Sequence, residues 1–210
     1  MKCKTEINCP EALIEAVRYV ERGDVVIIPT ENVYAFIFSG RFTKTIDRVY
    51  GIKKRSRKKG FVVCTTKEGI SDYAILPPEA QNIVNSIWPA PVSLVLKKKP
   101  SISDEITCGL DSAAFMCLKS PVIRYITENA VGPVCATTCN ISTQSEIHTF
   151  VDAAKYFGDV VDLIIEDDTL ETYGIPTTIV SFVEDKPTVL RTGGFPPKEL
   201  KEKYISDLII

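Results

Sequence analysis

Hydrophobic residues follow two spacings along this chain, and each spacing predicts a different element. Between residues 10 and 22, aliphatic side chains recur every three or four positions, and Gly23 follows them. This pattern predicts an amphipathic helix that ends at the glycine. The next segment, Asp24 to Ile28, is a short apolar run that stops at Pro29. It predicts a buried strand.

The same alternation continues to the end of the chain. Further helices are predicted at residues 43–52, 78–87, 121–130, 150–157 and 197–209. Further strands are predicted at residues 61–64, 92–96, 112–118, 134–138, 160–165, 177–182 and 187–191. Because helices and strands mix throughout and the last two strands pair as a predicted hairpin, we expect an α/β (α+β) fold with one mixed sheet. No repeat or low-complexity segment interrupts residues 1–210, which are expected to form one domain with a core at about 10–195.

The composition is that of an ordinary soluble globular protein. Of the 210 residues, 45% are hydrophobic and 25% are charged. No apolar run approaches the roughly 20 residues that a membrane-spanning helix needs, and the first residues lack the apolar core of a secretion signal. We therefore expect a cytoplasmic protein with no membrane partner.

The cysteines and the single histidine limit the chemistry further. The seven cysteines are Cys3, Cys9, Cys64, Cys108, Cys117, Cys135 and Cys139, and no two of them form a C-x-x-C pair. Four of them lie in apolar runs, so we expect reduced, buried thiols rather than a zinc site. His148 lies in a polar stretch before a predicted helix, and it is a poor candidate for a catalytic base.

The most concentrated charge is a basic run from Lys53 to Lys59, in a chain whose formal net charge is −2. Six of its seven residues are Lys or Arg, and the run lies between a predicted helix and a predicted strand. Arginine offers a fixed fork for phosphate oxygens and lysine a mobile point charge. By itself the run also fits a solvated surface or a nucleic-acid patch, although no aromatic residues interleave to stack on bases.

Three other polar segments follow predicted strands. They are Ile28 to Tyr34, Ala136 to Thr143, and Val189 to Gly194, which contains Arg191. Strand ends in α/β sheets often hold ligands, and hydroxyl-rich turns can present donors to an anion. A capped strand end, a helix cap and a surface arginine explain the three segments equally well. No Walker A or G-x-G-x-x-G sequence is present, so the standard nucleotide-binding folds are not supported.

Taken together and in this order, these segments resemble the YrdC/Sua5/YciO family. The matching motifs are Pro29-Thr30-Glu31-Asn32-Val33-Tyr34-Ala35, Lys53-Lys54-Arg55, Trp88-Pro89-Ala90-Pro91, Thr138-Cys139-Asn140, Thr177-Thr178-Ile179-Val180 and Leu190-Arg191-Thr192-Gly193. Each motif alone is weak, but six of them in the right order and spacing are specific. The resemblance covers residues 10 to 195.

The resemblance implies a YrdC/RibB-like fold, an open twisted sheet with flanking helices around a concave, positively lined cavity. It also implies a nucleotidyltransferase that makes threonylcarbamoyl-adenylate from L-threonine, bicarbonate and ATP for the threonylcarbamoyladenosine modification at position 37 of tRNA. ATP would arrive with Mg²⁺ and bicarbonate would be a co-substrate. Partners implied beyond these small molecules are tRNA and tRNA-modification proteins.

The resemblance also assigns roles to individual residues. Lys53 and Arg55 would be catalytic, and the nucleotide would contact Lys53, Arg55, Lys59, Ser112, Thr138, Asn140 and Arg191. The amino-acid and carbamate side would be lined by Asn32, Tyr34, Cys64, Met116, Ala136 and Thr177, with no metal ligand in the protein. Attack of a carbamate oxygen on the α-phosphate needs charge neutralisation and in-line positioning more than a covalent nucleophile.

The departures from the family pattern fall mostly on the acceptor side. Asn32 stands where relatives usually have Thr, Ala35 and Ala90 where they have Gly, and Cys64 where His is common. Met116 stands where the arginine that grips the acceptor's carboxylate is expected. A charge-assisted hydrogen bond contributes about 1.5–3 kcal/mol, so its loss would weaken threonine binding roughly 10–150-fold.

Three functions therefore remain open on the sequence. The first is a divergent threonylcarbamoyl-adenylate synthase in which Lys119 or another cation grips the carboxylate. The second is an adenylating enzyme with another acceptor, such as carbamoyl phosphate or a different amine. The third is an RNA-binding module that kept the basic cavity and lost catalysis. Within the basic run, Lys54, Arg57 and Lys58 are expected to face solvent in all three.

Overall fold

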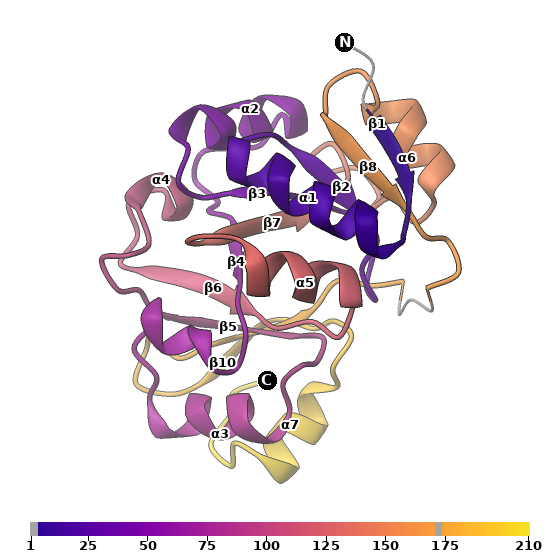
Figure 1. The fold of residues 1–210 in the computed structure, drawn as a ribbon. Helices are drawn as coiled ribbons and strands as arrows, with labels where there is room; N and C mark the ends of the chain where they lie inside the picture. The colour runs from indigo at the N-terminus through magenta and orange to yellow at the C-terminus, as the bar shows by residue number, and fades with distance from the viewer. Residues whose placement is uncertain (1–3, 171–173) are drawn as a thin grey trace.

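The computed structural model describes residues 4–170 and 174–210 and has a single ten-stranded mixed sheet with helices on both faces (Figure 1). The strands are β1 (Lys4–Ile7), β2 (Val26–Ile28), β3 (Ala35–Ser39), β4 (Val62–Cys64), β5 (Val92–Lys97), β6 (Ser112–Met116), β7 (Val134–Thr138), β8 (Leu163–Glu166), β9 (Thr178–Ser181) and β10 (Thr188–Arg191). The helices are α1 (Pro10–Arg22), α2 (Thr43–Lys53), α3 (Pro78–Ser86), α4 (Asp104–Thr107), α5 (Pro121–Asn129), α6 (Phe150–Phe157) and α7 (Pro197–Lys203), with a 3₁₀ turn η1 at Gly69–Asp72. The predicted fold class is confirmed.

The strand order is β1-β8-β2-β3-β7-β4-β6-β5-β9-β10. Pairing is parallel in β1·β8, β2·β8, β4·β6 and β5·β9, and antiparallel in the other neighbours. The predicted hairpin of β9 and β10 is present, with Val189 opposite Val180. In the described ranges, none of the helices has both the length and the apolar character that a bilayer span requires.

The structure corrects three sequence-based expectations. The strand β3 was not predicted, although its five buried residues form a short apolar run of the same kind as the one that predicted β2. The short elements β1 and α4 were also not predicted. The last helix ends at Lys203 rather than at residue 209, because the chain returns to the sheet edge, where Val189 donates its N–H to the carbonyl of Ile209 (2.8 Å).

Alternate side chains of the central strands point to two different cores. On one face, Phe36 and Phe38 of β3 pack with Phe115 of β6, and Phe36 contacts the Phe157 ring edge-to-face at 4.9 Å between centroids. On the other face, Ile37 and its neighbours pack under α1 and α5, which both lie on this face and contact each other. This second face also carries the candidate site.

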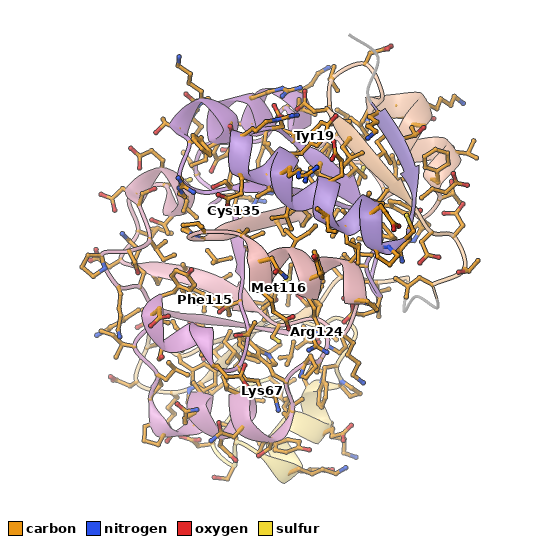
Figure 2. All side chains as sticks on the ribbon, in the orientation of Figure 1. Tyr19, Lys67, Phe115, Met116, Arg124 and Cys135 are labelled. Carbon is orange, nitrogen blue, oxygen red and sulfur yellow. The ribbon has the colours of Figure 1, made fainter. Side chains whose placement is uncertain are left out.

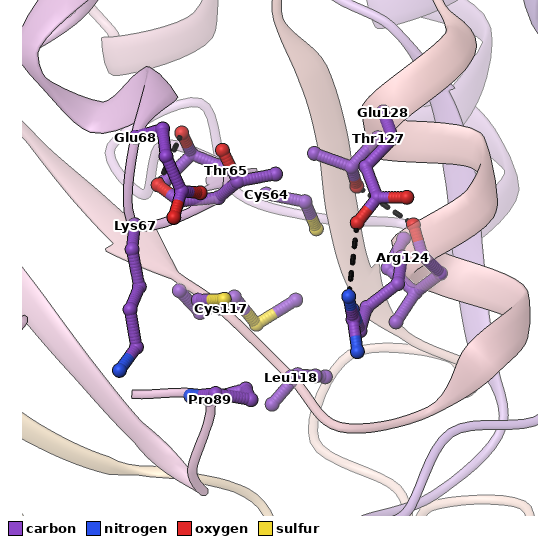
Figure 3. A pocket seen from close by; sticks show the side chains of 13 residues that line it. Cys64, Thr65, Lys67, Glu68, Pro89, Cys117, Leu118, Arg124, Thr127 and Glu128 are labelled. Atoms are coloured by element: carbon purple, nitrogen blue, oxygen red, sulfur yellow. Dashed lines mark hydrogen bonds and ion pairs between the residues drawn. The ribbon is translucent and has the colours of Figure 1, made fainter. Parts of the chain in front are cut away.

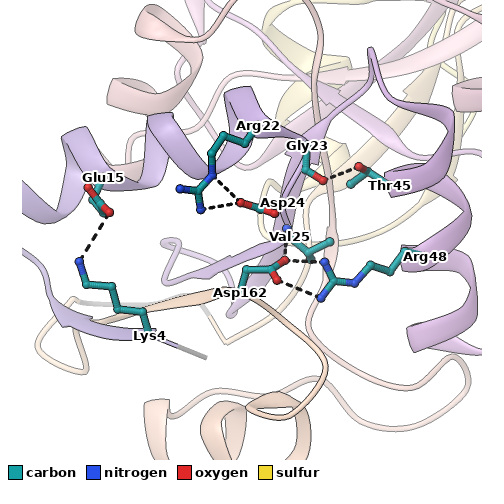
Figure 4. A network of polar contacts seen from close by, with 9 residues as sticks. All are labelled: Lys4, Glu15, Arg22, Gly23, Asp24, Val25, Thr45, Arg48 and Asp162. Carbon is teal, nitrogen blue, oxygen red and sulfur yellow. Dashed lines mark hydrogen bonds and ion pairs between the residues drawn. The ribbon is translucent and has the colours of Figure 1, made fainter. Parts of the chain in front are cut away.

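A polar network fixes the edge of the sheet where β2 and β8 meet α2. The Asp162 carboxylate accepts hydrogen bonds from the backbone N–H of Val25 (2.8 Å) and from Nη2 of Arg48 on α2 (3.2 Å). The turn after α1 is held in the same region, where Arg22 pairs with Asp24 at 2.7 Å (Figure 4). One carboxylate therefore joins the start of β8, the start of β2 and a helix, which places β2 and the segment that follows it.

Candidate active site

A hollow forms on the second face because small side chains lie side by side on neighbouring strands. The strand register places Ala136 opposite Val62, Val62 opposite Ala114, and Ala114 opposite Val95. Alanine at two of these four positions leaves space above β7, β4, β6 and β5. The resulting main cavity encloses about 390 Å³, and Arg55, Ser112, Thr138 and Arg191 line it together with these strands.

Arg55 reaches this cavity because helix α2 ends two residues before it. Lys54 at the helix C-cap adopts φ 48°, a left-handed conformation that turns the chain. The Arg55 side chain then donates from Nε to the carbonyl of Lys59 (3.0 Å) and from Nη2 to the carbonyl of Gly60 (2.7 Å). Its guanidinium also lies over the Phe61 ring, at 5.3 Å from the centroid. Burial lowers the pKa of Arg55, and a guanidinium nevertheless stays charged near neutral pH.

Arg191, the last residue of β10, is held in the same manner. Its Nε and Nη2 donate to the carbonyl of Thr177 at 3.0 and 2.8 Å. A guanidinium has five N–H donors, so both arginines keep donors for a ligand. Of the described residues that line the main cavity, these are the two cationic side chains, and none is a carboxylate. Two positive charges in a partly enclosed hollow favour an anionic ligand.

Lys53, two residues before Arg55, lies beneath the cavity rather than in it. Its side chain is 1% exposed, and its ammonium group donates to the carbonyls of Thr138 and Asn140 and to Oδ1 of Asn140 (2.8 Å). Burial, together with the nearby charge of Arg55, lowers the pKa of Lys53 to about 7. The three ammonium donors thus hold the turn after β7, and Thr138 adds a bond from its hydroxyl to Oδ1 of Asn140 (2.8 Å).

The predicted site residues therefore divide into two groups. Eight line the main cavity: Arg55, Ser112, Thr138 and Arg191 from the nucleotide set, and Asn32, Met116, Ala136 and Thr177 from the acceptor set. Five lie elsewhere: Lys53, Asn140, Lys59, Tyr34 and Cys64.

Each residue outside the main cavity has a visible reason for its place. The Lys59 side chain is exposed, and only its carbonyl turns inward, toward Arg55 and the Tyr50 hydroxyl. Tyr34 donates its hydroxyl to Oδ1 of Asp168 (2.8 Å), and burial raises its pKa. Cys64 is buried and lines a neighbouring smaller cavity, and burial raises the pKa of its thiol. The prediction that Lys54, Arg57 and Lys58 face solvent is confirmed.

Glu31 belongs to the motif Pro29 to Ala35, and the structure gives it a role that the sequence did not predict. It is 6% exposed, and its carboxylate accepts from the backbone N–H groups of Lys119 and Ser120, the latter at 2.9 Å. These groups precede the first turn of α5, where a negative charge is favourable. Glu31 therefore ties the segment after β2 to α5. An acidic residue shortly after an apolar run was the only sequence signal for this role.

Asn32 carries an unsatisfied acceptor at the edge of the main cavity. Its Nδ2 donates to the carbonyl of Ile175 at 2.7 Å, and its Oδ1 is buried without a partner. A carbonyl can only accept, so the amide nitrogen must face Ile175 and the oxygen must be the orphaned atom. Such an atom costs about 1–3 kcal/mol.

A smaller side cavity of about 130 Å³ adjoins the main one, and the side chains of Met116 and Leu118 line both (Figure 3). Lys67, in the loop after β4, and Arg124, on α5, contribute its positive charges. The described residues contain no group of three or more His, Cys, Asp and Glu side chains that could hold a metal ion.

Comparisons with known proteins all point to one family. The model of the Sua5/YciO/YrdC family, described as "Telomere recombination", matches residues 18–193. A protein of Methanocaldococcus jannaschii is 30% identical over 179 residues, covering 85% of this chain and 84% of that protein. The threonylcarbamoyl-AMP synthase of Pyrococcus abyssi is 27% identical over 197 residues, covering 93% of this chain but 57% of that protein.

Solved structures agree with the sequence matches. Pyrococcus abyssi Sua5 in complex with L-threonine superimposes with a TM-score of 0.89 at 25% identity, covering 99% of this chain and 62% of the other. Escherichia coli YciO superimposes with a TM-score of 0.81 at 19% identity, covering 94% and 97% of the two chains. The chain thus spans somewhat over half the length of the Pyrococcus relative and nearly all of the shorter one.

Proposed function

Since this chain belongs to the Sua5/YciO/YrdC family, we propose that it is an ATP-dependent nucleotidyltransferase that forms threonylcarbamoyl-adenylate for tRNA modification. The observation that carries this proposal is the pair of guanidinium groups, Arg55 and Arg191, in a cavity whose described lining contains no carboxylate. Relatives named threonylcarbamoyl-AMP synthase support the product class. The substrates would be ATP, bicarbonate and L-threonine.

The triphosphate of ATP fits the side of the cavity that we call the nucleotide wall, made of Arg55, Ser112, Thr138 and Arg191. Arg55 and Arg191 would neutralise phosphate charge with the N–H donors that their backbone partners leave free. The hydroxyl of Ser112 can donate one further bond, whereas the hydroxyl of Thr138 already donates to Oδ1 of Asn140 and can only accept from a ligand. Mg²⁺ would come with the phosphates of ATP as part of the substrate.

The chemistry asks little of this chain beyond binding and orientation. Bicarbonate and the amine of the acceptor condense to a carbamate with loss of water. A carbamate oxygen then forms a bond to the α-phosphorus, the bond to the bridging β-phosphate oxygen breaks, and pyrophosphate leaves with the electron pair. Fixed cationic donors lower the barrier of such a step by stabilising charge that develops on phosphate oxygens.

The acceptor side leaves a second candidate, an adenylating enzyme with an acceptor other than threonine. We call this side the acceptor wall: Asn32, Met116, Leu118 and Thr177. Met116 cannot donate a hydrogen bond to a carboxylate, and the unpaired Oδ1 of Asn32 favours an N–H donor in the ligand. An acceptor with an amide or carbamoyl group would satisfy both conditions.

Pyrophosphate release from ATP, Mg²⁺ and bicarbonate, measured with one acceptor at a time, tests the proposal. Threonine-dependent release is the expected result. Release with carbamoyl phosphate or another amine and none with threonine would replace the first candidate with the second. An Arg55→Ala variant should abolish release with any acceptor, whereas Arg57→Ala should not, because Arg57 is exposed and paired with Asp47 (2.7 Å). ATP binding that survives Arg55→Ala unchanged would refute the nucleotide wall.

A further inference from the structure

We propose that Tyr50 and Cys108 are positioning residues for Arg55, and that they act through a chain of hydrogen bonds that ends at the carbonyl of Lys59. The proposal rests on the proposed function, because it takes Arg55 as a guanidinium that binds phosphate. Neither Tyr50 nor Cys108 is among the described residues that line the main cavity, and neither belongs to the six motifs. They support the nucleotide wall from behind.

The two residues come from different helices. Tyr50 lies in the last turn of α2 and is 4% exposed, and Cys108 is the C-cap residue of α4, with φ 59°. The two helices are neighbours in the fold (Figures 1 and 2). The Cys108 sulfur lies 2.9 Å from the Tyr50 hydroxyl oxygen. This contact therefore joins the end of α4 to the end of α2, directly before the chain turns toward Arg55.

The direction of each hydrogen bond follows from the protons that the groups carry. The Tyr50 hydroxyl donates to the carbonyl of Lys59 at 3.0 Å. A carbonyl can only accept, and a tyrosine hydroxyl has one proton to give. The thiol of Cys108 must then donate its proton to the Tyr50 oxygen. Burial raises the pKa of Tyr50, so the hydroxyl keeps its proton near neutral pH.

The Lys59 carbonyl is where this chain of hydrogen bonds meets the nucleotide wall. It also accepts from Nε of Arg55 at 3.0 Å, so both of its lone pairs are used. Residues 56–59 are exposed, and water competes for a carbonyl in such a loop. Tyr50 provides a donor from the buried side. The carbonyl is thereby fixed, and with it the orientation of the Arg55 guanidinium before ATP binds.

Packing and hydrogen bonding of Tyr50 can be separated by one substitution. The Tyr50 ring packs against the Phe61 ring at 4.5 Å between centroids, and Arg55 lies over the same Phe61 ring. Phenylalanine at position 50 keeps the ring and removes only the hydroxyl. A change in Tyr50→Phe therefore reports on the hydrogen bond to Lys59 rather than on the aromatic contact.

Tyr50→Phe tests the proposal directly. It is expected to lower kcat/KM for ATP about fivefold, the value of one net hydrogen bond, when pyrophosphate release is measured. Tyr156→Phe, which removes an exposed hydroxyl on α6, is the matched control and should change nothing. Cys108→Ala removes the donor to Tyr50 and is expected to cost two- to threefold. Cys108→Ser, which keeps a donor, should restore the wild-type value.

A change of background shows whether Tyr50 acts through Arg55. Arg55→Lys keeps the positive charge but loses the Nε–H donor, so Tyr50→Phe should cost less than twofold in that background. In Arg191→Ala the bond between Arg55 and Lys59 is untouched, so Tyr50→Phe should again cost about fivefold. A role of Tyr50 in folding alone would lower kcat/KM equally in both backgrounds.

Two results would overturn the proposal: an unchanged kcat/KM in Tyr50→Phe, or an equal loss in the Arg55→Lys and Arg191→Ala backgrounds. If the wild-type protein binds ATP but releases no pyrophosphate, the same comparisons are made on the Kd for ATP by titration calorimetry. The proposed reaction then fails, while the variants still decide whether Tyr50 positions Arg55. The two failures are therefore distinguishable. A wild-type protein that binds no ATP would contradict both.

Discussion

The nucleotide wall and the acceptor wall of the main cavity are held in different ways. Arg55 and Arg191 each donate two hydrogen bonds to backbone carbonyls, so their guanidinium groups are oriented before any ligand arrives. Met116 has no polar contact, and Asn32 keeps an unpaired oxygen. Preorganised charges suit the step that needs precise geometry, the transfer at phosphorus. Fewer polar contacts hold the acceptor wall, so substitutions there can change the substrate with the smallest loss of folding stability.

Loss of a preorganised charge should have the largest effect. Arg191→Ala is expected to lower kcat/KM for ATP about 100-fold, because each charge-assisted hydrogen bond contributes about 1.5–3 kcal/mol. Steady-state pyrophosphate release measures this. Arg22→Ala, which removes an exposed pair with Asp24 far from the cavity, is the control. A loss below threefold for Arg191→Ala would mean that the nucleotide wall is not where ATP binds.

The support of the acceptor wall is expected to be structural. Glu31→Ala should lower the free energy of unfolding by about 2 kcal/mol, since two backbone N–H groups lose their acceptor at the start of α5. Urea denaturation measures this. Glu31→Gln keeps one acceptor oxygen and should lose about half as much. An unchanged midpoint for both variants would show that water replaces the carboxylate there.

Giving the acceptor wall a fixed charge should make the two walls more alike. Met116→Arg is expected to lower the KM for L-threonine about tenfold if threonine is the acceptor. The KM for ATP should not change. Met116→Gln, a neutral polar side chain of similar length, is the control. If the KM for threonine rose in Met116→Arg but not in Met116→Gln, a positive charge at this wall would weaken threonine binding.

The smallest expected effect is a pH dependence from Lys53, whose pKa in the folded protein is lowered to about 7. Above pH 7 the unfolded chain binds more protons at this lysine than the folded protein does. The free energy of unfolding should therefore rise with pH, by about 1 kcal/mol between pH 7 and 8. A Lys53→Met variant should lack this rise. Parallel curves for the two proteins over pH 7 to 9 would show that Lys53 remains charged.

The basic run shows how far the sequence could go. It contains two residues, Lys53 and Arg55, that the family resemblance placed together on the phosphates. The structure keeps Arg55 in the main cavity and puts Lys53 under the turn after β7. The cause is local: α2 ends at Lys53, and the left-handed Lys54 turns the chain between them. A count of charges could not distinguish these two positions.

The sequence could not predict the side cavity, for a different reason. Lys67 and Arg124 lie 57 positions apart in the printed sequence, and neither belongs to a motif. They come together because β4 and β6 pair in parallel, with Cys64 opposite Met116, and α5 follows β6 directly. Contacts of this kind depend on strand register and helix placement, which the hydrophobic pattern does not specify.

By itself the sequence determined the family, the mixed α/β class, most of the helices and strands, and the exposure of Lys54, Arg57 and Lys58. Those features follow from local spacing and ordered motifs. Only the tertiary structure decided which polar side chains share a cavity, which ones are used up by backbone partners, and which charges remain for a ligand. The physical reason is that a side chain's availability depends on all of its neighbours in space, and most of those come from distant parts of the chain.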